Sequence, residues 1–225
     1  MECSRLLLPS LLLSFCWLVF FHALYKGKQR NALAFTACPD QDAVVENLKL
    51  HFTGILWMGL IPFLLYKTVL SYVPDAFVIV LPRKPDWWIL LPISIMVITG
   101  LHESLKQIAS SHLPATNRSI ILYSGLRIVY IISYEQFFRG WILFESLKLL
   151  SPAPAIFLNT FLYFLYHFFS DRKELVGTIL LGPLLCFISL KTGSALGAVL
   201  IHLALTVSYE APLLIHKIKS TKTTI

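Results

Sequence analysis

Long apolar runs are the feature that most constrains how this chain folds. The first, LLLPSLLLSFCWLVFFHALY at residues 6–25, holds no acidic or basic side chain other than one histidine, and KGKQR follows it. A helix needs about 20 predominantly apolar residues to cross a bilayer. The run has that length, and no clean small-residue cleavage site follows it. We therefore expect a retained membrane helix rather than a signal peptide.

The composition of the whole chain supports the same class. Of its 225 residues, 56% are hydrophobic and 14% are charged, whereas soluble domains average about 25% charged residues. The net charge is +7, but Lys and Arg mostly flank apolar runs, which suits lipid headgroups. No basic stripe with interleaved aromatic residues is present. We expect an integral, multi-pass membrane protein whose partners are lipids and not nucleic acid, and its oligomeric state is left open.

Seven apolar stretches are candidates for membrane spans. They predict an all-α fold, a polytopic helical bundle of about seven transmembrane helices. The longest polar stretch between them is 26–51, and the two close prolines of SPAP at 151–154 are typical of a helix start. The candidate spans are residues 6–25, 53–73, 87–102, 119–146, 153–170, 174–190 and 194–215.

Ionisable residues inside these spans are the candidate functional residues. Each costs roughly 2.5–3.5 kcal/mol at the bilayer centre, so such residues usually mark a functional site or a buried pair. Lys67 and Glu210 lie near span ends, where long side chains reach the headgroups, and they are set aside. The remaining candidates are Arg127, Glu135, Arg139, His167, Glu174 and His202.

Two of these candidates lie together in SYEQFFRGWIL, residues 133–143. Glu135 and Arg139 are four residues apart and therefore share one face of a helix. The plainer interpretation is that they neutralise each other and fix helix packing. The alternative is that they are held in the bundle for chemistry.

The two histidines have plain interpretations of their own. His167 lies near the end of its span, where an interfacial or hydrogen-bonded role is common. His202 lies deep among Leu, Ile and Val, with Thr206 one turn further along the same face, and local hydrogen bonding explains it.

Taken as a set, these residues predict more than packing. If they converge, Glu135 has the chemistry of a general base that shares a proton with His167, and His202 that of a donor to an oxyanion. The same three side chains have the chemistry to ligate a divalent metal such as zinc. Neither HExxH nor CxxC is present, so spacing alone supports no metal or other cofactor.

Three short motifs, in order, resemble those of the CPBP intramembrane proteases, the relatives of the CAAX prenyl endopeptidases and the bacterial Abi proteins. The family's EExxFRG corresponds to YEQFFRG at 134–140, with Glu135 and Arg139 in place. Its FxxxH corresponds to YFLYH at 163–167, and its HxxxN to HLALT at 202–206. The resemblance covers about 119–206.

The chain departs from the family pattern at three positions. Tyr134 replaces the first Glu, which is the family's usual candidate for activating water, and Tyr163 replaces the Phe of the second motif. Thr206 replaces the Asn of the third motif, although its hydroxyl still donates a hydrogen bond. In single-Glu members with a basic-acidic turn after the histidine, a residue such as Glu174 supplies the second carboxylate.

The resemblance implies a membrane-embedded endopeptidase that hydrolyses peptide bonds of a membrane-associated peptide or protein. It implies Glu135 as general base with His167, Arg139 as the residue that orients Glu135, and His202 with Thr206 at the oxyanion. It also implies N-terminal helices and loops over 1–118, a catalytic core over 119–215 and a short basic tail over 216–225. The single-Glu motif suggests a bacterial plasma (inner) membrane.

Two other functions stay open at this point. The loss of the first Glu favours an inactive family member that works as a membrane binding or bacteriocin-immunity protein. A small transporter would use Glu135 and the histidines as a proton relay, but no pair of broken helices in matching halves supports it.

Overall fold

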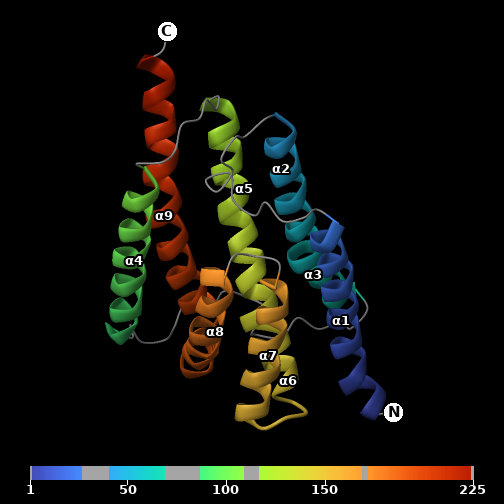
Figure 1. The fold of residues 1–225 in the computed structure, drawn as a ribbon. Coiled ribbons are helices and arrows are strands. Elements are labelled where there is room, and N and C mark those ends of the chain that lie inside the picture. The colour runs from blue at the N-terminus through green and yellow to red at the C-terminus, as the bar shows by residue number, and fades with distance from the viewer. Residues whose placement is uncertain (1, 27–40, 69–86, 109–116, 169–171, 224–225) are drawn as a thin grey trace. The chain divides into compact units, whose positions relative to one another are not determined.

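The computed structural model describes residues 2–26, 41–68, 87–108, 117–168 and 172–223, and every regular element in these ranges is a helix (Figure 1). The predicted all-α class is thus confirmed. The elements are α1 (Glu2–Lys26), α2 (Gln41–Ile55), the π-helix η2 (Leu56–Leu60), α3 (Ile61–Thr68), the 3-10 helix η4 (Trp87–Ile89), α4 (Leu90–Ile108), α5 (Asn117–Glu135), the π-helix η5 (Gln136–Ile142), α6 (Leu143–Ser146), α7 (Pro152–Tyr166), α8 (Arg172–Thr192) and α9 (Leu196–Thr223).

Five helical stretches in the described part of the chain are long and apolar enough to cross a membrane. The predicted count of about seven is not confirmed, because 119–146 and 153–170 are not among them. α7 has only 15 residues, a rise of about 22 Å against a hydrocarbon core of about 30 Å, and charged side chains interrupt 119–146. The five are Leu8–Tyr25, Val45–Thr68, Trp87–Ile108, Arg172–Thr192 and Leu196–His216.

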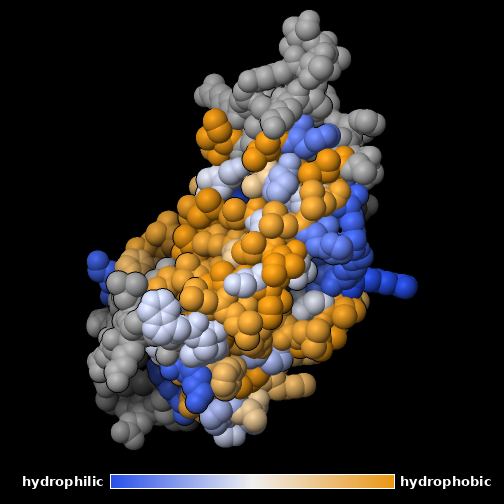
Figure 2. Space-filling model, turned by 90° about the vertical axis from the view of Figure 1, so that its left-hand side faces the viewer, coloured by the Kyte–Doolittle hydropathy of each residue, from blue (hydrophilic) through white to orange (hydrophobic). Residues whose placement is uncertain are grey.

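The exposed side chains of these helices are largely apolar. Leu11, Ile98, Ile179 and Leu180 each leave more than half of their surface uncovered. In Figure 2, most of the coloured surface in view is hydrophobic, with hydrophilic residues gathered at its margins. A water-soluble protein rarely exposes so much contiguous apolar surface. The chain is an integral membrane protein.

The helices form two compact units, and each is described by itself. Unit 1 comprises Met1–Gln29, Thr53–Asp86 and Ile132–Val199. Unit 2 comprises Arg30–Phe52, Trp87–Ile131 and Leu200–Ile225. The predicted division at residues 118 and 215 follows the chain in sequence order and stays a prediction.

In unit 1, α7 packs against α8 along its length. Gly182 permits this, because a Cβ there would lie 2.9 Å from Thr160 Cγ2. Leu143, Ala155 and Cys186, from α6, α7 and α8, form a buried apolar cluster beside this interface. The helix pair therefore offers a firm support for η5, which contacts both helices.

Local sequence signals set the ends of these two helices. Ser151 is extended and Pro152 takes the first helical position of α7, where its missing N–H removes no hydrogen bond. The predicted helix start at SPAP is confirmed. α8 ends where Gly193 adopts φ +65° and Ser194 N donates to Ser189 O at 3.2 Å, the 6→1 bond of a Schellman motif.

In unit 2, α4 lies against α9. A Cβ on Gly100 would lie 2.8 Å from the Leu205 carbonyl oxygen, so only glycine allows the two helices to come this close. The Ser208 hydroxyl contacts the Met96 carbonyl oxygen at 3.4 Å. The part of α9 that carries His202 is therefore held on one side by α4.

Candidate active site

The motif YEQFFRG lies where a regular helix gives way to a π-helix. Glu135 is the last residue of α5, and η5 follows at once. All seven residues of η5 are buried. π-Helical segments are rare and frequently lie at functional sites. The sequence predicted a helix here but carried no signal for its wider turn.

Glu135 and Arg139 form an ion pair inside unit 1. Arg139 Nη1 lies 3.3 Å from Glu135 Oε2, and both side chains are fully buried. The Arg139 guanidinium also lies over the Tyr163 ring, 4.2 Å from its centroid, a cation–π contact that strengthens when water is excluded. The predicted pairing on one helix face is therefore confirmed, and arginine has a second partner on α7.

His167 caps the C-terminal end of α7, and its side chain is half-buried. Its Nδ1 lies 3.0 Å from the Tyr163 carbonyl oxygen. Because a carbonyl oxygen only accepts hydrogen bonds, Nδ1 carries the hydrogen, and the basic lone pair of the neutral ring is on Nε2. The geometry thus selects the tautomer that a proton acceptor at Nε2 requires.

Tyr134, at the position of the family's first Glu, is buried among rings from α7. Its centroid lies 4.8 Å from that of Tyr166, 5.7 Å from that of Tyr163 and 6.3 Å from the His167 ring. His167 in turn meets Tyr163 and Tyr166 edge-on, at 4.6 and 4.7 Å. An aromatic cluster therefore fills the place of the missing carboxylate and joins the end of α5 to the end of α7.

Glu174 lies in the first turn of α8 and is half-buried. It is close enough to Tyr163 to act on it electrostatically. Glu174 follows His167 by seven residues, which would be about two turns of a continuous helix, but α7 ends at Tyr166 and α8 begins at Arg172. The two side chains are therefore carried by separate helices of unit 1.

His202 and Thr206 lie one turn apart on α9, in unit 2. His202 is half-buried and Thr206 is buried. Glu135, Arg139, His167 and Glu174 all belong to unit 1, so the structure brings these four into one unit and places the third motif in the other.

Metal-binding geometry is absent from the described ranges. No group of three His, Cys, Asp or Glu side chains there is arranged to hold a metal ion. The ligand set of Glu135, His167 and His202 stays a prediction from the sequence.

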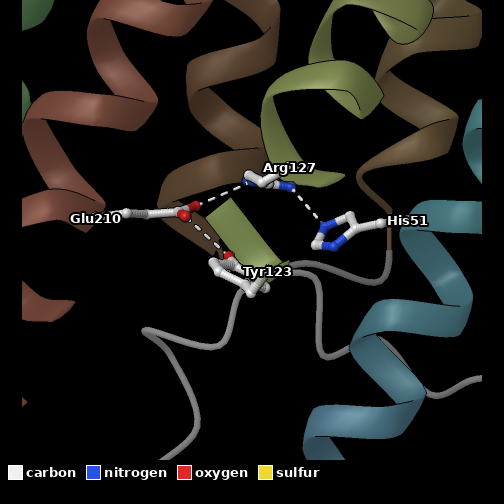
Figure 3. A network of polar contacts seen from close by, with 4 residues as sticks. All are labelled: His51, Tyr123, Arg127 and Glu210. Atoms are coloured by element: carbon white, nitrogen blue, oxygen red, sulfur yellow. Dashed lines mark hydrogen bonds and ion pairs between the residues drawn. The ribbon is translucent and has the colours of Figure 1, made fainter. Parts of the chain in front are cut away.

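A second buried charge network lies in unit 2 (Figure 3). Arg127 Nε lies 3.1 Å from Glu210 Oε1, and the Tyr123 hydroxyl donates to Glu210 Oε2 at 2.8 Å. Arg127 Nη1 lies 3.3 Å from His51 Nε2. Because arginine only donates, His51 Nε2 is the acceptor. The network joins α2, α5 and α9.

This network corrects the sequence analysis at one residue. Glu210 was expected to reach the headgroups from a span end, but its side chain is only 7% exposed and is paired with Arg127. The spacing of His202, Thr206 and Glu210, one turn each, carried the missing signal, because it places all three on one face of α9.

Comparisons with known proteins agree with the motifs. A family model described as type II CAAX prenyl endopeptidase Rce1-like matches residues 110–208. The match contains all three motifs, so the predicted family resemblance is confirmed. No curated protein and no solved structure matches the chain.

Proposed function

We propose that this chain, which resembles the Rce1-like type II CAAX prenyl endopeptidases over residues 110–208, is a membrane-embedded endopeptidase that cuts a membrane-associated substrate. The observation that carries the proposal is the fully buried Glu135–Arg139 pair, which lies within the segment that the family model matches. His167, in the same unit, has a defined tautomer. A buried ion pair adds little net stability, because the loss of hydration offsets most of the attraction between the charges. Stability alone therefore does not explain this pair. A carboxylate so placed suits a group that must hold and release a proton.

In the proposed reaction, Glu135 takes a proton from water while the water oxygen bonds to the carbonyl carbon of the scissile peptide. His167 shares that proton through Nε2. The carbon–nitrogen bond then breaks, and the leaving amine receives the proton. Arg139 holds the Glu135 carboxylate in position through the ion pair, and Tyr163 holds Arg139 through its ring.

Three further residues have proposed roles. His202 and Thr206, at the positions of the family's third motif, donate hydrogen bonds to the oxyanion that forms when water attacks. Glu174, which acts electrostatically on Tyr163, supplies the second carboxylate in place of the lost first Glu. No step of this route passes through a metal ion.

The proposed location is the plasma (inner) membrane of a bacterium. The support is the single-Glu form of the first motif together with five apolar helices of spanning length in the described ranges. The substrate is then a peptide or protein held at that membrane.

A second candidate function rests on Tyr134. Its ring contacts fill the position where the family's first carboxylate would lie. An inactive relative that binds a membrane partner, for example as an immunity protein, would need no carboxylate there. Such a protein would still bind its partner after Glu135→Gln.

The test uses purified protein in lipid vesicles with a farnesylated, fluorogenic CAAX peptide as probe. The wild type is expected to cleave the peptide, and Glu135→Gln to lower the rate by about 100-fold or more. Cleavage that survives Glu135→Gln at the wild-type rate would contradict the assigned mechanism. A wild type that binds the peptide without cutting it would favour the inactive relative.

A further inference from the structure

A buried amide on α7 ties η5 to the helices around it. Asn159 is fully buried. Its Nδ2 donates to the Phe138 carbonyl oxygen at 2.5 Å, and its Oδ1 accepts from Cys186 Sγ at 3.1 Å. An amide in an apolar interior is costly unless such bonds satisfy it. One side chain therefore joins α7, η5 and α8.

The place of Asn159 on its helix connects it with the candidate active site. Asn159, Tyr163 and His167 follow one another at intervals of four residues, so they share one face of α7. The guanidinium of Arg139 lies over the ring of Tyr163. The main-chain oxygen that Asn159 binds belongs to Phe138, the residue directly before Arg139.

The hydrogen bond from Asn159 is made to a carbonyl oxygen that also takes part in the π-helical hydrogen bonding of η5. The Phe138 carbonyl oxygen also accepts from the Leu143 N–H, the i→i+5 bond of the π-helix. A π-helix is seldom stable over many turns. The amide of Asn159 adds a second hydrogen bond at the same oxygen and fixes the position of the segment that bears Arg139.

We infer that Asn159 is a positioning residue for the proposed endopeptidase: it holds the main chain of η5 so that Arg139 stays between Glu135 and the Tyr163 ring. The inference rests on the proposed function for its kinetic consequence. A displacement of about 1 Å at a reacting group lowers rates by up to about 100-fold. Asn159 touches no substrate, so its loss changes kcat and leaves KM nearly unchanged.

The kinetic test compares Asn159→Ala with Thr160→Val on the farnesylated CAAX peptide. Thr160 is the next residue on α7 and faces Gly182, so its variant removes a hydroxyl from the same helix and leaves the bond from Asn159 to Phe138 in place. We expect Asn159→Ala to lower kcat by about 10-fold to 100-fold with KM within about twofold. Thr160→Val is expected to stay near wild type in both constants.

A second pair of variants keeps the inference testable if Asn159→Ala does not fold. Cys186→Ala removes the thiol that donates to Asn159 Oδ1, and Cys186→Ser retains a donor there. We expect a smaller loss of kcat from the first and recovery in the second. Equal kcat in Asn159→Ala and Thr160→Val, or equal loss in both Cys186 variants, would overturn the inference.

A measurement that needs no cleavage separates this inference from the proposed function. Trp141 is buried in η5, with its ring 6.1 Å from that of Phe137. In a variant whose other tryptophans are phenylalanine, Asn159→Ala should red-shift the Trp141 emission and increase its quenching by acrylamide. Unchanged emission contradicts the positioning role even if the wild type cuts no peptide, and a shift supports it in the same case.

Discussion

The two buried charge networks differ in what they connect. In unit 1, Glu135 and Arg139 are four residues apart on one continuous stretch of helix, and rings from α7 surround them. In unit 2, Arg127 and Glu210 are 83 residues apart and join α5 to α9. A pair that bridges helices stabilises their packing directly. A pair within one helix does so only through its other contacts.

The difference supports the proposal that the unit 1 pair is the one held for chemistry. A buried ion pair contributes little net stability, because desolvation offsets most of the attraction. The unit 2 pair gains from further bonds to Tyr123 and His51, which suits a structural role. The unit 1 pair is fully buried where α5 meets the π-helix η5, and its arginine lies over the Tyr163 ring, which is consistent with the proposed catalytic role.

The largest expected effect is on stability, from Arg127→Leu. The substitution leaves the Glu210 charge buried without its arginine, which costs about 3–5 kcal/mol. The free energy of unfolding in mixed detergent micelles measures it. The double variant Arg127→Leu/Glu210→Leu is the control, since removal of both charges should recover part of the loss. A change below about 0.5 kcal/mol in the single variant would show that the network does not hold unit 2 together.

The next effect is on activity, from His167→Phe. Phenylalanine keeps the edge-on contacts with Tyr163 and Tyr166 but lacks the Nε2 acceptor. We expect kcat on the farnesylated CAAX peptide to fall by about 100-fold, with the unfolding free energy changed by less than about 1 kcal/mol. A stable variant that cleaves at the wild-type rate would remove His167 from the mechanism.

The smallest expected effect comes from Tyr134→Phe. The ring contacts of Tyr134 with Phe138 and Tyr166 remain, and only the hydroxyl is lost. Because a phenol is a poor base at neutral pH, we expect cleavage within about threefold of wild type. A loss of 100-fold would instead show that Tyr134 has taken over the role of the family's first Glu.

The sequence predicted the elements whose signals are local. Apolar length predicted helices such as α1 and α9, the prolines of SPAP predicted the start of α7, and the four-residue spacing predicted the Glu135–Arg139 pair. Each of these depends on residues that are neighbours along the chain.

The sequence did not predict contacts between residues that are far apart along the chain. The bond from Asn159 to Phe138 spans 21 residues, and that from Arg127 to Glu210 spans 83. No periodic pattern shows which distant residue is the partner. The spacing from His202 places Glu210 on the same face of α9 but does not identify Arg127, and Asn159 carries no signal in the sequence at all. The π-helical turn of η5 was equally hidden, because its hydrogen bonds differ from those of an α-helix by one residue.

The most direct measurement compares Glu135→Gln with Glu210→Gln in the same vesicles, on the same farnesylated CAAX peptide. Each variant neutralises the carboxylate of one buried pair. Glu135→Asp, which keeps the charge, is the folding control for the first. We predict that Glu135→Gln loses cleavage by about 100-fold or more, while Glu210→Gln unfolds more easily but cleaves within about threefold of wild type. Equal rates in the two variants would contradict the assignment of chemistry to unit 1.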